Sequence, residues 1–571
     1  AYITRKKING TTYYYAEQRE WRNGKSRRKW QKYLGNIDSI IHAVEGKSKA
    51  PTYAKLFDLG DVAAYLSIAN EINIADEINR MLPKKKEGLS IGDYIQIAAV
   101  NRGTDSVSKN SMWEWFKETV LLNYYSGIKA SSLSSQRFWD NMDLIPEDRI
   151  TDIWMRLINK VITDYKIDLS QVSYDGTNFY TFISSFNIRN TIAKRGKNKQ
   201  GRSNLRQISY ALFCSKEDHI PLYFDIYEGN KSDSKEFLKI IPGFVESFKG
   251  RISADSPITI VFDKGNNSPE NINILDESPF NFVASAKLNE HKELVEISNN
   301  DKKFKPLNHE KLENIKAFKT KKNIYGKQRT LVISFNSNLY NDQLCTINND
   351  IKKSLEKLDE LNQRLKNRAD GVITKGRKPT VASVKKSVSD ILKRQYMKDV
   401  ISIKYCERNK IPIIDYTIDT QALHRISDTY LGKKIIFTDN HHWDMADIIV
   451  AYNSQYVIEH AFREIKNRKN SSWWPMYHYT NQKIKVHGLY CTITLLLRSL
   501  MARKVRENKI NISTEQIHEK LRGIKEVVNV FEKPIEGKKK KKTTKNHTLT
   551  KMDNIQRKLY EIFKISDYST F

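Results

Sequence analysis

The chain has 571 residues, and its 39% hydrophobic and 11% aromatic content is enough for several packed cores, which excludes a disordered protein. Lysine and arginine number 97 against 66 aspartates and glutamates, so the formal net charge is +31, spread over most of the length. This excess favours a polyanionic partner such as DNA or RNA, although a lysine-rich genome is an alternative explanation.

The cysteines and the apolar runs indicate the cellular compartment of the protein. The four cysteines lie too far apart in the sequence to suggest a zinc knuckle or a redox pair, which predicts a reduced compartment: Cys214, Cys345, Cys406 and Cys491. The longest apolar run, residues 489–497, is too short to cross a bilayer, and the first ten residues lack the apolar core of a signal peptide. We therefore expect a cytoplasmic protein without a membrane segment.

Two modules are predicted before the first long series of strands. Residues 1–45 combine Tyr, Trp and Arg with turn signals at Asn9-Gly10 and Asn23-Gly24, which predicts a basic β-meander. Nucleic-acid contact and a purely structural sheet are both compatible with that pattern. Residues 52–160 carry apolar residues at helical spacing and predict a helical module for DNA binding or dimerisation.

The hydrophobic period changes from helical to alternating at Leu169. Within residues 169–298, three strand-like runs come first, LSQVSYDGTNFY, RQISYALFC and IPLYFDIYEG. A helix, the strand ITIVFD, a short helix from Pro269 and the strand NFVASAKL follow. This order predicts an α/β, RNase H-like fold, whose mixed sheet has its first strand in the centre.

Residues 299–440 interrupt this order. A hairpin, further strands and a long amphipathic helix marked by Ile351, Leu355 and Leu358 predict a β-rich insertion with helical arms. The core is expected to resume over residues 441–510. Residues 511–571 are predicted to form a basic C-terminal tail with a short helix, in which the five lysines 538–542 suit a solvated linker or a nonspecific DNA contact.

The resumed core contains the run YNSQYVIEHAFREIK, from Tyr452 to Lys466. It lacks Gly and Pro and has apolar residues at three- and four-residue steps, so it predicts one amphipathic helix. Tyr452, Gln455, Glu459 and Lys466 would lie near one face of that helix. A solvated polar stripe on a core helix has the same spacing, so the spacing alone leaves both interpretations open.

The register Tyr452-x2-Gln455-x3-Glu459-x6-Lys466 resembles the Y-x2-R-x3-E-x6-K signature of the insertion-sequence-four group of bacterial DDE-class transposases. The resemblance extends over about residues 169–504, and Gln455 replaces the arginine of the signature. It implies that Glu459 is the third metal-binding carboxylate and that Tyr452 and Lys466 contact phosphates of the transposon end. At Gln455 a neutral hydrogen bond would replace the charged contact.

The resemblance also implies roles for residues around this signature. Arg202 lies in a basic segment before the second strand, and Gly229 and Asp233 lie in a turn after the third, where a positive φ and a helix cap are expected. The residues expected to contact DNA are Tyr452, Gln455, Lys466, Arg202, Tyr456 and Arg463. Those expected to orient a metal ligand or to touch phosphate are His478 and His487.

Two further carboxylates complete the expected site. Asp175 ends the first predicted strand and Asp263 the fourth, and these two strand ends lie side by side in an RNase H-like sheet. A lone aspartate at a strand end is usually a turn residue. Two of them combined with Glu459 predict a catalytic site of three hard oxygen donors, which suits two Mg²⁺ ions, with Mn²⁺ as a substitute, better than zinc.

The function that the resemblance implies is DNA transposition of the cut-and-paste type. Metal-dependent strand cleavage at inverted repeats would be followed by strand transfer into target DNA, by a homodimer on two paired ends in the bacterial nucleoid. The alternatives are a catalytically silent DNA-binding descendant and a host nuclease of the same fold. ATP is not expected, because the P-loop-like run 371–378 has Arg377 where the phosphate-binding lysine belongs.

Overall fold

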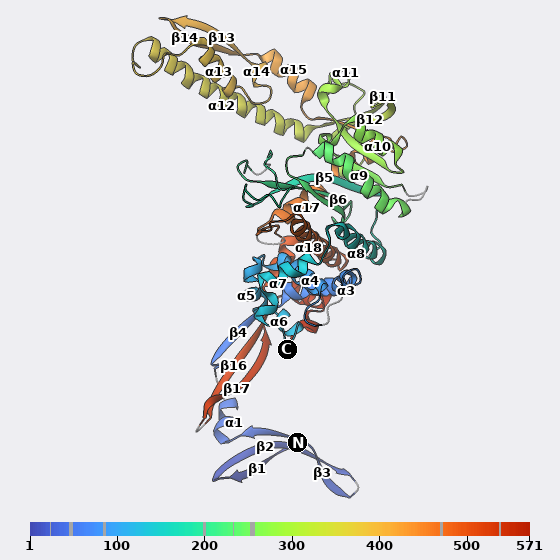
Figure 1. Cartoon of the computed structure of the whole chain (residues 1–571), viewed down its shortest axis with the longest axis vertical. Coiled ribbons are helices and arrows are strands. Elements are labelled where there is room, and N and C mark those ends of the chain that lie inside the picture. Colours follow the sequence, from blue (N-terminus) through green and yellow to red (C-terminus); the bar gives the residue numbers. More distant parts are fainter. Residues whose placement is uncertain are drawn as a thin grey trace. The chain divides into compact units, whose positions relative to one another are not determined.

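The computed structural model describes residues 1–22, 24–44, 50–83, 87–197, 201–231, 233–251, 257–468, 472–535 and 538–570. The chain divides into two compact units (Figure 1). One unit contains residues 1–63, 116–126 and 518–571, and the other contains residues 64–115 and 127–517. Within the described ranges, no helix is both long and apolar enough to cross a membrane.

The smaller unit begins with the predicted meander, an antiparallel sheet of β1 (Tyr2–Ile8), β2 (Thr11–Arg22) and β3 (Lys25–Gly35). Asn9 and Gly10 both have positive φ, 46° and 79°, as the tight turn between β1 and β2 requires. The second predicted turn includes Asn23, which lies outside the described residues. Helix α1 (Ile37–Val44) follows the sheet.

A second sheet of this unit corrects two predictions. Strand β16 (Lys525–Ile535) pairs with β4 (Tyr53–Asp58) and with β17 (Lys538–Leu549). The predicted helical module 52–160 therefore starts with a strand and is divided between the two units. The lysine run 538–542 lies in β17 instead of a linker, because β16 provides hydrogen-bond partners for its backbone. Helices α6 (Leu121–Tyr124) and α20 (Asn554–Ile562) also belong to this unit.

The larger unit is built on a nine-stranded mixed sheet of order β10-β11-β12-β15-β9-β8-β5-β6-β7. The first strand, β5 (Gln171–Tyr180), is parallel to β8 (Thr259–Phe262) and antiparallel to β6 (Gln207–Ser215). Beyond these lie β7 (Pro221–Glu228) and β9 (Asn281–Ala286). Within the five strands β9-β8-β5-β6-β7, the sequence therefore predicted the order along the chain and the central place of β5 correctly.

Helices cover both faces of the sheet. Helices α9 (Asp233–Phe248) and α10 (Pro269–Glu277) follow β7 and β8 in the chain, and the ring of Phe213 on β6 stacks on Phe244 of α9 at 4.2 Å. On the other face, Tyr210 of β6 hydrogen-bonds Thr492 of α18 (Asn481–Glu507) at 2.8 Å. Most of α18 is buried, and α4 (Ile91–Thr104), α7 (Ser135–Asp143) and α8 (Ile150–Asp164) pack against it. The remaining N-terminal helices are α2 (Gly60–Glu71), α3 (Ile74–Asn79) and α5 (Met112–Lys117).

The insertion differs from the β-rich domain that was predicted. Its strands β10 (Lys305–Pro306), β11 (Ile315–Ile324), β12 (Lys327–Asn336) and β15 (Lys433–Thr438) extend the main sheet, since β15 pairs with β9. Residues 337–430 then form an arm with its own apolar core (Figure 1). The arm is mainly helical and consists of α12 (Ser337–Ala369), α13 (Val381–Ile391), α14 (Met397–Val400), α15 (Thr420–Tyr430) and the hairpin β13 (Ile401–Arg408) and β14 (Ile411–Ile418).

Candidate active site

The segment predicted as one helix is two helices in the structure. Helix α16 (Met445–Asn453) ends before Ser454, and α17 (Tyr456–Lys466) starts after Gln455. The buried Ser454 hydroxyl donates to the Ala451 carbonyl at 2.6 Å and accepts a hydrogen bond from the Gln171 amide of β5. These contacts fasten the junction to the sheet. Tyr452 and Glu459 therefore lie on consecutive helices and not on one face of a single helix.

Helix α17 runs along the face of β5 that bears the odd-numbered residues. Gln171 of β5 contacts Ser454 just before α17, and Thr177 accepts a hydrogen bond from the Lys466 ammonium at its other end. Side chains alternate along a strand, so Asp175 faces the same side as these two residues. Glu459, between the two anchored ends of α17, therefore lies over the face that carries Asp175.

The sheet register brings Asp175 and Asp263 to the same level. Ser173 of β5 pairs with Val261 of the parallel strand β8, and two more residues along both strands lead to Asp175 and Asp263. Adjacent strands lie about 4.8 Å apart, and paired residues of parallel strands point to the same face. Asp263 follows β8, as predicted, whereas Asp175 lies within β5 because the antiparallel partner β6 extends that strand to Tyr180.

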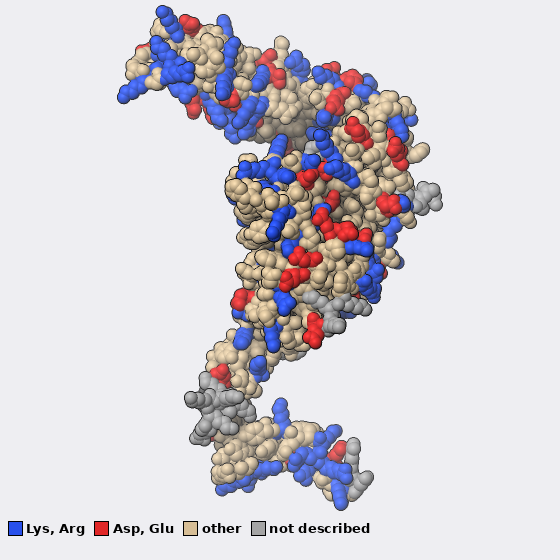
Figure 2. Space-filling view, viewed as in Figure 1, with Lys and Arg blue, Asp and Glu red and all other residues tan. Residues whose placement is uncertain are grey.

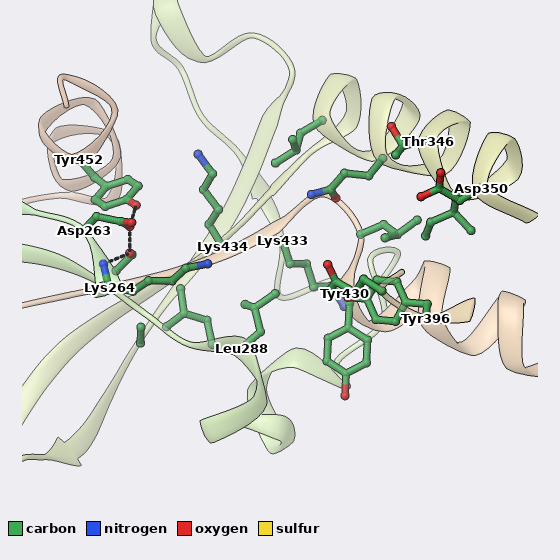
Figure 3. A pocket seen from close by; sticks show the side chains of 18 residues that line it. Asp263, Lys264, Leu288, Thr346, Asp350, Tyr396, Tyr430, Lys433, Lys434 and Tyr452 are labelled. Carbon is green, nitrogen blue, oxygen red and sulfur yellow. Dashed lines mark hydrogen bonds between the residues drawn. The ribbon is translucent and has the colours of Figure 1, made fainter. Parts of the chain in front are cut away.

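Asp263 is held by two hydroxyl groups. Its Oδ1 accepts hydrogen bonds from Ser285 of β9 at 3.0 Å and from the Tyr452 hydroxyl at 3.1 Å (Figure 3). Tyr452 is 8% exposed, and its burial raises the pKa of the phenol above its usual value. The negative charges of Asp263 and Glu459 also raise the pKa of Tyr452, which places Glu459 near the Tyr452 ring. Tyr452 thus remains a hydrogen-bond donor.

Lys434, which the sequence did not indicate, adds a cation to this cluster. Its ammonium lies 5.6 Å from the centre of the Tyr452 ring. Burial lowers the pKa of Lys434, whereas the nearby Asp263 and Glu459 favour its charged form. In the sequence Lys434 is one lysine of the alternating run KKIIFT, and only the pairing of β15 with β9 brings it to this place.

The cluster opens into a cleft of about 470 Å³ between the sheet and the arm. Asp263, Lys264, Lys434 and Tyr452 line its inner side, and Thr346 and Asp350 of α12 lie on the opposite side (Figure 3). Three lysines line this cleft together with Asp263: Lys264, Lys433 and Lys434. The cleft wall beside Asp263 therefore carries the positive charge that an anionic substrate requires.

The other residues expected to contact DNA are distributed around α17. Arg463 is exposed, and Gln455 is partly buried at the start of α17. Tyr456 is 64% exposed and lies beside His219, in the turn between β6 and β7. Arg202 lies over the Tyr180 ring at the end of β5, at 5.8 Å from its centre.

His478 and His487 do not belong to the carboxylate cluster. Both are buried, His478 Nε2 lies 3.2 Å from His487 Nδ1, and His487 Nε2 donates to the Trp473 carbonyl at 2.7 Å. Burial lowers the pKa of both imidazoles well below the usual value, so they are neutral. The predicted role beside the carboxylates is wrong, because these imidazoles fill a core network with Trp473 and Tyr490.

Gly229 is required for a different reason from the one predicted. Its φ is not positive, but a Cβ there would lie 1.9 Å from the Gln207 carbonyl oxygen, so only glycine permits this approach of the two chains. The Gln207 amide in turn donates to the Gly229 carbonyl at 2.7 Å. Asp233 starts α9, but its side chain lies outside the described part of the structure.

The donor set Asp175, Asp263 and Glu459 suits a hard divalent cation, since it offers carboxylate oxygens only. Within the described ranges, no three His, Cys, Asp or Glu side chains lie close enough together to hold a metal ion. Tyr452, Ser285 and Lys434 occupy the space around Asp263 instead. The residue types therefore suit a divalent cation, and the three carboxylates lie farther apart than the ligands of one coordination shell.

The mixed strands β9-β8-β5-β6-β7, with β5 in their centre and carboxylates within β5 and directly after β8, define an RNase H-like core. The family model described as Transposase DDE domain matches residues 168–497. That match covers more than half of the chain, which therefore belongs to the family of DDE transposases. Membership implies dependence on a divalent metal ion.

Comparison with solved structures also gave likenesses. Among solved structures, the chain is similar to the piggyBac transposase in a cryo-EM structure of its synaptic complex with hairpin DNA. The sequence identity is 10%, the TM-score is 0.34, and the alignment covers 81% of this chain and 79% of that one. The search of curated proteins gave no significant match.

Proposed function

We propose that this DDE transposase cleaves DNA at the two ends of a bacterial insertion sequence and joins the released 3′-hydroxyl groups to target DNA. This proposal is supported by the positions of Asp175, Asp263 and Glu459 on elements that pack at the same face of the sheet. Asp175 is level with Asp263, and Glu459 shares the neighbours Tyr452 and Lys434 with Asp263.

Asp175, Asp263 and Glu459 would hold the divalent cations, with Mg²⁺ as the natural ion and Mn²⁺ as a substitute. Cations bound there supply Lewis-acid stabilisation of a phosphorane-like charge and a lowered pKa for the attacking hydroxyl. The chain's own residues contribute orientation and charge. Tyr452 and Ser285 fix the Asp263 carboxylate, and Lys434 provides a positive charge next to the place where a phosphate approaches.

The surface charge supports DNA as the partner. Residues 361–398, at the end of α12 and over α13, include eleven lysines and arginines and only two acidic residues. Arg364, Arg377 and Lys378 are exposed and line a cavity of about 530 Å³. Blue side chains gather over the arm in Figure 2. Such a surface suits phosphates of the DNA that enters the cleft, with a strong dependence on salt.

A homodimer that pairs two ends in a synaptic complex, acting on the nucleoid, completes the proposal. The rival functions are a host nuclease of the same fold and a silent DNA-binding protein. A duplex that carries the element's own end, with flanking DNA, is incubated with the purified chain, a second labelled duplex and Mg²⁺. Cleavage followed by joining supports transposition, cleavage without joining indicates a nuclease, and binding alone indicates the silent descendant.

A further inference from the structure

A second polar cavity lies in the larger unit, built from residues that the carboxylate site does not use. Its volume is about 250 Å³. It is lined by Arg102 of α4, Lys109 of the short 3-10 helix Lys109–Ser111, Ser135 and Trp139 of α7, and Tyr477 and His478 of the segment before α18. This volume suits one compact polar group, since pockets for drug-sized ligands measure about 300–1,000 Å³.

Two cations of this cavity are buried. Lys109 is 8% exposed and Arg102 is 1% exposed. Among the residues that the structure describes, the Lys109 ammonium has no hydrogen-bond partner, and neither have Nε and Nη1 of Arg102. Arg102 Nη2 donates to the carbonyls of Val107 and Pro475 at 3.3 and 3.2 Å. Most of the hydrogen-bonding capacity of these two side chains is therefore unused.

No acidic side chain of the described ranges forms an ion pair with Lys109 or Arg102. The ammonium of Lys109 lies 4.5 Å from the ring centre of Tyr490 and 4.8 Å from that of Phe138. Such cation–π contacts offset only part of the cost of burying an ion. Burial, with Arg102 beside it, lowers the pKa of Lys109 well below its usual value.

The remaining polar atoms of the cavity support an anion as the missing partner. Ser135 is the first residue of α7, whose amino-terminal end adds positive potential. Buried donors with no acceptor are rare in folded proteins, and those of Lys109 and Arg102 around one cavity point to a ligand that provides acceptors.

We propose that this cavity binds an oxyanion with the chemistry of a phosphate group, held by Lys109 and Arg102. Its oxygens accept hydrogen bonds from the Lys109 ammonium and from the free guanidinium nitrogens of Arg102, so that two buried charges are compensated. The phosphate comes from a DNA phosphodiester or from a free phosphate or nucleotide. The site is separate from Asp175, Asp263 and Glu459, and it does not depend on the transposition chemistry.

The test measures the melting temperature of the full chain in chloride and in inorganic phosphate at equal ionic strength. The wild type is expected to gain a saturable increase in Tm with phosphate. Lys109→Met is expected to melt above the wild type in chloride, because a buried amine without a hydrogen-bond partner is gone, and to lose the increase. Lys129→Met removes one exposed lysine of the same unit and is expected to respond like the wild type.

A second variant provides the anion from within the protein. Ser135→Glu places a carboxylate at the cavity, and it is expected to raise the Tm in chloride and to abolish the response to phosphate. An equal phosphate response in the wild type, Lys109→Met and Ser135→Glu would overturn the proposal, because it would show only the general stabilisation by this salt. Absence of a saturable response in the wild type would overturn it as well.

DNA binding separates the two sources of the phosphate. If the group is a DNA phosphodiester, Lys109→Met lowers the affinity for duplex DNA and reduces the salt slope by about 1, and free phosphate competes with DNA. If the group is a free phosphate or nucleotide, DNA affinity and slope stay at the wild-type values while the Tm response is lost. Both results support an oxyanion at Lys109 and assign its source.

Discussion

The Tyr452 hydroxyl donates a hydrogen bond to Asp263 Oδ1 over 3.1 Å, and this bond joins α16 to the end of β8. It connects two residues that are 189 positions apart in the sequence. Since burial and the neighbouring carboxylates raise the pKa of the phenol, the donor is retained over the whole physiological pH range. Tyr452 therefore fixes the Asp263 carboxylate, whereas the resemblance had implied a contact with DNA phosphate.

Replacing Tyr452 by phenylalanine removes only this donor. We expect Tyr452→Phe to slow cleavage of end DNA about 10- to 100-fold, the range for partners that orient a metal ligand. The free energy of unfolding should change by about 1 kcal/mol, the value of one hydrogen bond. Single-turnover cleavage and urea denaturation measure the two effects. Tyr124→Phe, which alters an exposed phenol of the smaller unit, is the control, and equal rates for both variants would contradict the role of Tyr452.

The adjacent lysines Lys433 and Lys434 should separate stability from activity. The Lys433 ammonium is buried and donates to the carbonyls of Val295, Ile297 and Asp428 at 2.6–2.8 Å. Lys433→Met should therefore lower the free energy of unfolding by about 1–3 kcal/mol, since it leaves buried acceptors unpaired. Lys434→Met should keep the stability and reduce cleavage about tenfold or more. A loss of stability in Lys434→Met together with a loss of cleavage in Lys433→Met would refute the placement of Lys434 beside the carboxylates.

A buried ion pair holds the Glu459 helix on α18. Glu464 is 7% exposed, Arg498 is 2% exposed, and their side chains form a salt bridge. Arg498→Met should cost about 3–5 kcal/mol, because it leaves the Glu464 carboxylate buried without its partner. The double variant Glu464→Gln, Arg498→Met should recover most of that loss in a double-mutant cycle. Additive losses would show that the two side chains do not depend on each other.

Asp439, at the end of β15, predicts a pH dependence of stability. Burial raises the pKa of its carboxyl from 3.8 to about 6, while the Phe282 amide donates to Oδ1 at 2.9 Å. Well below pH 3.8 the group is protonated in both the folded and the unfolded state. As the pH rises towards 6, only the unfolded state ionises freely, so folding loses up to about 3 kcal/mol relative to Asp439→Asn. Denaturation of both proteins at pH 4 and 7 measures this loss, and parallel curves would contradict it.

The sequence predicted the core better than its surroundings. Alternating runs around Asp175 and Asp263 gave the strands and their order, because buried strands and their turns have strong local signals. The break between α16 and α17 has no such signal, since it depends on the contact of Ser454 with Gln171, 283 residues away. The sequence did not indicate Lys434 either, because only the pairing of β15 with β9 brings this residue to the site. The role given to His478 failed because burial, and not residue type, decides what an imidazole does.

The most direct test compares Glu459→Gln with the wild type on DNA that carries the element's end. Glutamine keeps the size of the side chain and removes the negative charge that a divalent cation requires. We predict that Mg²⁺-dependent cleavage falls by about 10⁴-fold or more, as for loss of an essential catalytic group, while DNA affinity in the absence of metal stays unchanged. Cleavage at the wild-type rate by Glu459→Gln would contradict the three-carboxylate site.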